Sequence, residues 1–134
     1  MTYGINNHED IYGIEKVLNI NPQFSWNDVK YIERIDYYID LDEYGEQVSN
    51  LKILFLIELP DKAIYKLLVK FNAIHNLNIN NIGGKYNQIM GFEIVDQLTA
   101  GWEYEQRYVV RDYENETIKF YCKSIEIVSV LFLL

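Results

Sequence analysis

The chain has 134 residues, of which 49% are hydrophobic and 15% aromatic, so it can build the core of one domain and a disordered chain is not expected. Its 20 acidic and 12 basic residues give a formal charge of −8, which repels a phosphate backbone and attracts a basic partner, so we expect no nucleic-acid binding. The single cysteine, Cys122, cannot form an internal disulfide, which favours a cytoplasmic protein.

The first expected element is a helix over residues 8–19, with Asn7 as its cap. Its helical spacing is carried by Ile11, Ile14, Val17 and Leu18. Residues 1–10 lack the basic and then apolar pattern of a secretory signal, which again favours the cytoplasm. Pro22 and the polar residues around it interrupt the pattern that follows.

The next segment alternates between apolar and charged residues, which predicts a strand over residues 29–41. Its apolar side carries Val29, Tyr31, Ile35, Tyr37, Ile39 and Leu41. Residues 42–50 are polar and contain Gly45, so they predict an exposed hairpin loop. Residues 51–59 are apolar on both faces apart from Lys52 and Glu58, which predicts a central strand.

Odd-numbered apolar residues continue from Tyr65 to Ile79, which predicts one long bent strand or two strands in register. After a turn at Gly83 and Gly84, a further strand is expected over residues 86–94. No lysine–serine pair or spaced glycine motif follows these glycines, so we interpret them as turn residues and not as a phosphate-binding loop.

Two strands, over residues 102–112 and 118–127, flank a short polar loop and predict a hairpin. The apolar parity changes in its second arm, which predicts a β-bulge near Lys123 and Ser124. The apolar stretch over residues 125–134 is too short to span a bilayer as a helix, which needs about 20 residues. We expect a buried final strand there and no membrane association.

Strands at this spacing, with few breakers, predict a mainly β fold that is formally α+β because of one short N-terminal helix. The expected architecture is an antiparallel β-sandwich or an open barrel. No internal repeat, low-complexity linker or second composition zone is present, so residues 1–134 are expected to form a single domain.

Few residues are candidates for catalysis or metal binding, and a structural role explains each of them better. His75 has no cysteine or histidine nearby in the sequence, so we interpret it as a core or edge histidine and not as a base or ligand. His8, Glu9 and Asp10 resemble a helix start, and Cys122 alternates toward the core as an inert thiol. We therefore expect no enzyme and no catalytic, cofactor-binding or metal site.

One group of residues is a candidate surface for binding a partner. Its carboxylates can pair with lysine or arginine on that partner, and its tyrosines can anchor the contact. The alternative interpretation is a solvated strand face and loop. The candidate residues are Asp36, Tyr38, Asp40, Asp42, Glu43, Tyr44 and Glu46.

Positions between residues 22 and 127 carry a family resemblance. They form three groups, in the order Pro22, Phe24, Ser25, Trp26, Asp28, Val29, then Leu67, Val69, Phe71, Leu77, then Tyr86, Asn87, Gln88, Ile89, Gly91, Phe92. In these positions the chain resembles small bacterial immunity proteins of the polymorphic-toxin type. The resemblance implies a protein that binds a toxin domain, often encoded beside it, and silences it. Together with the charge of −8 and the lack of a catalytic set, it leads us to expect an acidic face that is complementary to a basic, nuclease-like toxin domain. Such families often have a His-Asp pair after the Phe, where this chain has Ser25 and Trp26, so no shared histidine site is implied.

Two other functions stay open from the sequence. One is an oligomeric structural or phage-derived assembly protein, which would use an exposed strand edge and the apolar C-terminal stretch. The other is a small ligand-binding β-barrel with a pocket lined by tyrosines and His75. Homodimerisation by edge pairing is also left open.

Overall fold

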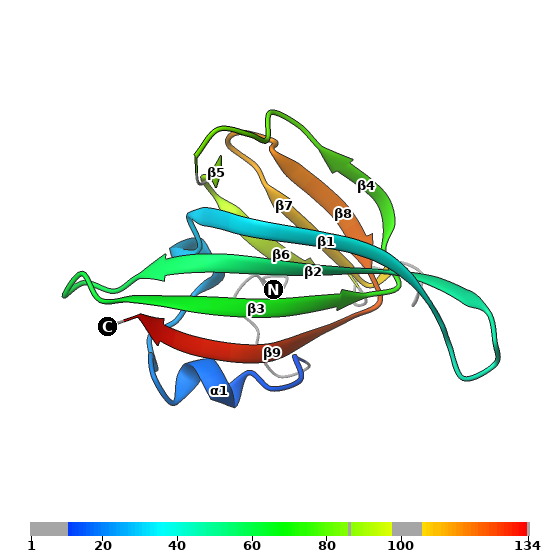
Figure 1. Cartoon of the computed structure of the whole chain (residues 1–134), viewed down its shortest axis with the longest axis horizontal. Coiled ribbons are helices and arrows are strands. Elements are labelled where there is room, and N and C mark those ends of the chain that lie inside the picture. Colours follow the sequence, from blue (N-terminus) through cyan, green and yellow to red (C-terminus); the bar gives the residue numbers. More distant parts are fainter. Residues whose placement is uncertain (1–10, 86, 98–105, 134) are drawn as a thin grey trace.

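The computed structural model describes residues 11–85, 87–97 and 106–133 and shows a mainly β protein, as the sequence predicts (Figure 1). Within these ranges there are one α-helix, one 3-10 turn and nine strands. The elements are α1 (Glu15–Leu18), η1 (Trp26–Asp28), β1 (Tyr31–Leu41), β2 (Gln47–Glu58), β3 (Ile64–Asn72), β4 (His75–Ile79), β5 (Asn87–Gln88), β6 (Phe92–Asp96), β7 (Tyr108–Asp112), β8 (Ile118–Cys122) and β9 (Ser124–Leu133).

The strands form two antiparallel sheets packed face to face, which is the predicted β-sandwich. The first sheet has the order β5-β1-β2-β3-β9 and the second has the order β4-β8-β7-β6. Aromatic rings from the two sheets meet in the core. The ring centroids of Phe55 and Phe92 lie 5.2 Å apart, and those of Phe71 and Phe120 lie 4.9 Å apart.

Two neighbouring strands pass from one sheet to the other at the same place. β3 and β9 pair in the first sheet as far as Asn72 and Ser124, and β4 and β8 continue the pair in the second sheet from His75 and Tyr121. The long run that the sequence predicts here is therefore two strands in different sheets. The bulge predicted near Lys123 is wrong, because the parity changes where the chain leaves one sheet and enters the other.

The N-terminal helix is shorter than the sequence predicts, because α1 covers only Glu15–Leu18. Gly13 has a φ of +76°, which is incompatible with a right-handed helix and prevents an earlier start within the described residues. The first part of the expected helix, before residue 11, lies outside the described residues. No helix in the described ranges is long and apolar enough to cross a bilayer.

A short 3-10 turn, η1, follows and was not predicted. Ser25 and Asp28 form a capping box, in which the Asn27 N–H donates to Ser25 Oγ at 3.4 Å and the Ser25 N–H donates to Asp28 Oδ2 at 3.0 Å. This turn buries Trp26 against the core at the end of the sandwich.

β1 and β2 form a long hairpin that extends past the rest of the first sheet (Figure 1). Its turn occupies residues 42–46 only, so the loop predicted over residues 42–50 is too long. β3 pairs with β2 from Leu51 onward. The residues of β2 before Leu51 pair with β1, and the Ser49 carbonyl also accepts from the Ile74 N–H at 2.8 Å where the chain leaves β3. Residues 37–50 therefore start at the end of the three-stranded region and project beyond it, and we call them the hairpin arm.

Candidate functional site

One face of the hairpin arm is apolar and exposed. Tyr37, Ile39 and Leu41 alternate along β1, and 53%, 55% and 64% of their surfaces are accessible. Tyr37 lies opposite Leu51, which is completely buried, so this face continues the core-facing side of the sheet beyond the core. The Tyr37 hydroxyl lies 3.1 Å from Ser49 Oγ across the arm. We call Tyr37, Ile39 and Leu41 the apolar strip.

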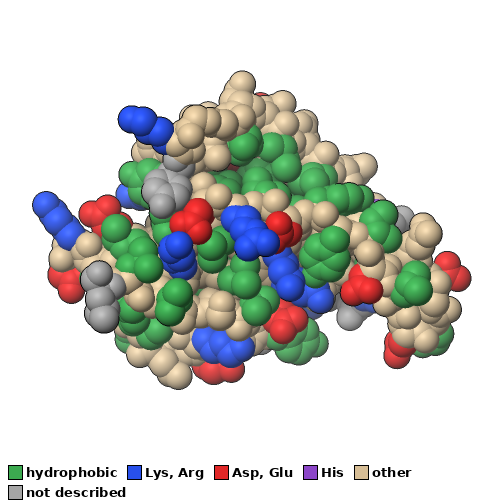
Figure 2. All heavy atoms as spheres, in the orientation of Figure 1, with side chains coloured by type: hydrophobic (Ala, Val, Ile, Leu, Met, Phe, Trp, Pro, Cys, Tyr) green, Lys and Arg blue, Asp and Glu red, His purple; other side chains and the backbone are tan. Residues whose placement is uncertain are grey.

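The opposite face of β1 and the turn at the tip of the arm are acidic. No lysine, arginine or histidine lies between residues 35 and 51, whereas five carboxylates do, namely those of Asp36, Asp40, Asp42, Glu43 and Glu46. Figure 2 shows the arm at the right of the view, with acidic and hydrophobic side chains on its visible face. Where the arm joins the sheet, Asp36 pairs with Arg34 Nε at 3.0 Å, and Lys52 Nζ lies 5.7 Å from the centre of the Tyr38 ring.

The turn at the tip of the arm is built around Asp42. Its Oδ1 accepts hydrogen bonds from the backbone N–H groups of Tyr44 at 2.8 Å and Glu46 at 2.9 Å. Gly45 has a φ of +78°, a conformation that a side chain disfavours, and it closes the turn into β2. The turn therefore holds Glu43 and Tyr44 in solvent, and Tyr44 is 81% exposed.

The structure brings all seven predicted partner-binding residues together in one hairpin, but it gives them different roles. The side chains of Asp36, Tyr38, Asp40 and Asp42 have partners within the chain, whereas Glu43, Tyr44 and Glu46 are exposed in the turn. The sequence analysis missed the apolar strip, because alternation identifies a side of a strand and not what covers that side.

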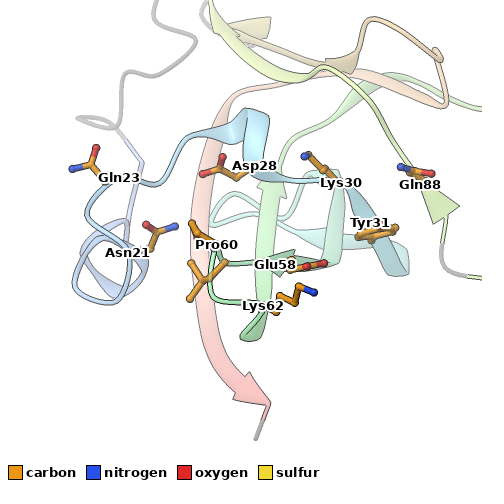
Figure 3. A pocket seen from close by; sticks show the side chains of 10 residues that line it. Asn21, Gln23, Asp28, Lys30, Tyr31, Glu58, Pro60, Lys62 and Gln88 are labelled. Atoms are coloured by element: carbon orange, nitrogen blue, oxygen red, sulfur yellow. The ribbon is translucent and has the colours of Figure 1, made fainter.

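A polar cleft of about 560 Å³ lies where the β2–β3 turn faces the segment before β1. Figure 3 shows acidic Asp28 and Glu58 and basic Lys30 and Lys62 distributed around it. Its lining contains no histidine, cysteine or serine. His75, which the ligand-binding alternative requires, is exposed on the edge strand β4 and is not part of this lining.

Two buried groups have raised pKa values. Burial raises the pKa of the Tyr65 hydroxyl, which lies near Asn21 and Asp28. Burial also raises the pKa of the Cys122 thiol far above its ordinary value. Both groups stay protonated at neutral pH, and the prediction of a buried Cys122 is confirmed.

No family model matches this chain, and no curated protein or solved structure was found to be similar to it. The functional argument therefore depends on the molecule itself. Among the described residues no group of three or more metal-ligating side chains occurs. The hairpin arm combines an exposed apolar strip with a cluster of carboxylates at its tip, so it can bind a surface that is both apolar and basic.

Proposed function

We propose that this chain is a non-enzymatic binding protein of the immunity type, which binds a basic toxin domain through the hairpin arm and silences it. One observation carries the proposal. The arm projects from the sandwich with three large apolar side chains exposed on one face. It carries the carboxylates of Asp40, Asp42, Glu43 and Glu46 on a stretch, between residues 35 and 51, that contains no lysine, arginine or histidine.

The apolar strip supplies the affinity in this proposal. Neighbouring apolar side chains that stay exposed in a folded protein mark interaction surfaces. Their transfer from water into an interface contributes roughly 25 cal/mol per Å² of apolar area. Tyr44 at the tip adds an aromatic ring, which is one of the residue types that dominate binding energies.

The carboxylates determine the specificity for a basic partner in this proposal. A uniformly acidic arm attracts a basic surface from a distance and repels an acidic one, so it raises the association rate with a basic domain. A projecting arm can also enter a concave site that a flat sheet cannot reach. This shape supports a mode of silencing in which the arm occludes the toxin's active site.

The test is co-expression with the toxin-like protein encoded beside this gene. We expect growth rescue, co-purification of a stable complex, and an affinity that falls as salt is added. The absence of both rescue and complex would contradict the proposal.

Variants of the arm sharpen the test. Ile39→Lys places a charge in the apolar strip, and we expect the affinity to fall by at least about tenfold. Glu43→Lys with Glu46→Lys should mainly slow association and reverse its salt dependence. The matched control is Glu114→Lys with Glu116→Lys in the β7–β8 turn, which also reverses two carboxylates on exposed residues away from the arm. Equal weakening by the control would show that net charge, and not the arm, sets the affinity.

A further inference from the structure

β1 has an open edge along the hairpin arm. In the first sheet β1 pairs with β2 along its length, whereas β5 pairs with it only at Tyr31 and Ile32. From Arg34 to Leu41 no other strand of the described residues pairs with β1 on this side. An unpaired edge offers backbone N–H and C=O groups as a template for another strand.

The direction of the backbone groups along β1 follows from the hydrogen bonds near its start. The Lys30 carbonyl accepts from the Ile89 N–H at 2.8 Å, so even-numbered residues face the β5 side there. A bulge lies between Ile32 and Arg34, where one additional residue enters β1. The bulge shifts the alternation by one, so odd-numbered residues face the open edge beyond it.

The N–H and C=O groups of Ile35, Tyr37 and Ile39 are therefore turned to the open edge. The far end of β1 agrees with this alternation, because the Leu41 N–H donates to Asp40 Oδ1 at 2.9 Å and not to β2. That bond occupies the last donor of the edge. The free segment of the edge thus runs from Ile35 to Ile39, beside the apolar strip.

We propose that the partner adds an extended strand to this edge, and that basic and apolar side chains alternate along that strand. Successive side chains of an added strand fall on opposite faces of the sheet. The side chains on one face of the added strand lie beside the apolar strip, and those on its other face lie beside Asp36 and Asp40. This inference rests on the proposed function and deepens it, because it names the form in which the partner is recognised.

Charge favours a basic partner strand over a second copy of this chain. Two β1 edges paired across a two-fold axis would place the acidic face of one arm beside the acidic face of the other. Like charges opposite one another destabilise a pair of strands. A strand with lysine or arginine at alternate positions instead pairs its ammonium or guanidinium groups with the carboxylates of Asp36 and Asp40.

A peptide that alternates lysine and valine is the probe for the edge. We expect it to bind and to slow hydrogen exchange at the amides of Ile35, Tyr37 and Ile39. Two further peptides carry N-methyl groups, one on every valine nitrogen and one on every lysine nitrogen. Only one of these two nitrogen sets faces the edge, so one peptide should bind at least about tenfold more weakly and the other should bind normally. Equal binding of both peptides, or no binding of the parent peptide at millimolar concentration, would overturn the inference.

A pair of variants at one position separates backbone from side-chain recognition. Ile39→Ala removes the side chain and keeps the N–H, whereas Ile39→Pro removes both. The Ile39 N–H does not bond to β2, so proline is compatible with the hairpin at this edge position. We expect Ile39→Pro to bind the peptide at least about tenfold more weakly than Ile39→Ala. Equal affinities of the two variants would overturn strand addition.

The same exchange measurement on the complex with the neighbouring toxin-like protein distinguishes the two proposals. Protection of the Ile35, Tyr37 and Ile39 amides in that complex supports both. A stable complex without this protection overturns strand addition and leaves the proposed function standing. The absence of any complex contradicts the proposed function. The peptide and proline experiments then still show whether the open edge of β1 binds an added strand. A wild-type dimer that Ile39→Pro dissociates would instead assign the edge to a second copy and overturn the inference.

Discussion

The two ends of the β1–β2 hairpin carry the same alternation of side chains and have opposite environments. At the sheet end of β2, Ile53 and Phe55 are completely buried. At the arm end, Ile39 and Leu41 are more than half exposed although they lie on the same face. The side chains are of the same kind, so the difference comes from the second sheet, which covers one end and not the other.

The same contrast separates the stable part of the molecule from the part that we propose to bind a partner. The covered end belongs to a core of two sheets, whereas the arm is a two-stranded hairpin, which alone is marginally stable in water. Segments that bind partners are drawn from the less stable parts of a fold. The arm keeps its shape through a few local contacts, such as the Asp42 turn and the Tyr37–Ser49 bond.

The largest expected effect is a difference in stability between two truncations on this one face. Phe55→Ala removes a ring that contacts Phe92 in the core, and it should lower the free energy of unfolding by about 3–5 kcal/mol. Ile39→Ala should change it by less than about 0.5 kcal/mol, because the side chain is exposed. Urea unfolding with an unchanged m-value measures both. A large loss from Ile39→Ala would mean that the arm is part of the cooperative core.

A second prediction uses cysteine to compare the same two regions. Cys122 is buried in β8, so a thiol reagent should label it only when the whole protein unfolds. In the double variant Leu41→Cys with Cys122→Ala, the exposed thiol on the arm should react orders of magnitude faster. Comparable labelling rates at the two positions would contradict the contrast between core and arm.

The raised pKa of Cys122 adds a pH dependence with a definite sign. The folded state keeps the thiol protonated, whereas the unfolded chain ionises above an ordinary pKa of about 8.5. The unfolded state then binds fewer protons, so the stability contributed below that pH is lost as the pH rises, by up to about 1.4 kcal/mol per pH unit. The Cys122→Ala variant should lack this part of the alkaline loss in urea unfolding.

Local sequence patterns predicted that the fold consists of strands. Non-local contacts determined where a strand changes its parity, where the chain passes between sheets and which apolar faces stay exposed. The period of two identified a β-rich sandwich, because each strand shows its two faces in its own sequence. The bulge between Ile32 and Arg34 shifts the alternation of side chains along β1. The chain passes from the second sheet to the first just before Ser124, and the position of this passage depends on where β3 and β9 pair. The acidic part of the arm was predicted because its carboxylates are dense in sequence. The exposure of the apolar strip could not be predicted in the same way. It depends on how far the second sheet extends, and the strands of that sheet lie far along the chain.

The smallest expected effect tests whether the arm opens independently of the core. Gly45 has a φ of +78° and no atom within 4 Å of the position that a Cβ would take, so Gly45→Ala introduces backbone strain without a clash. The cost should be about 1 kcal/mol. If the arm opens by itself, the amides of Tyr44 and Glu46 should exchange about fivefold faster while those of Ile53 and Phe55 keep their rates. Gly84→Ala is the control, because it makes the same change at a φ of +86° with equally open space outside the arm. Faster exchange at Ile53 and Phe55 in Gly45→Ala would show that the arm and the core unfold as one unit, and the arm would then depend on the sandwich for its structure as well as for its position.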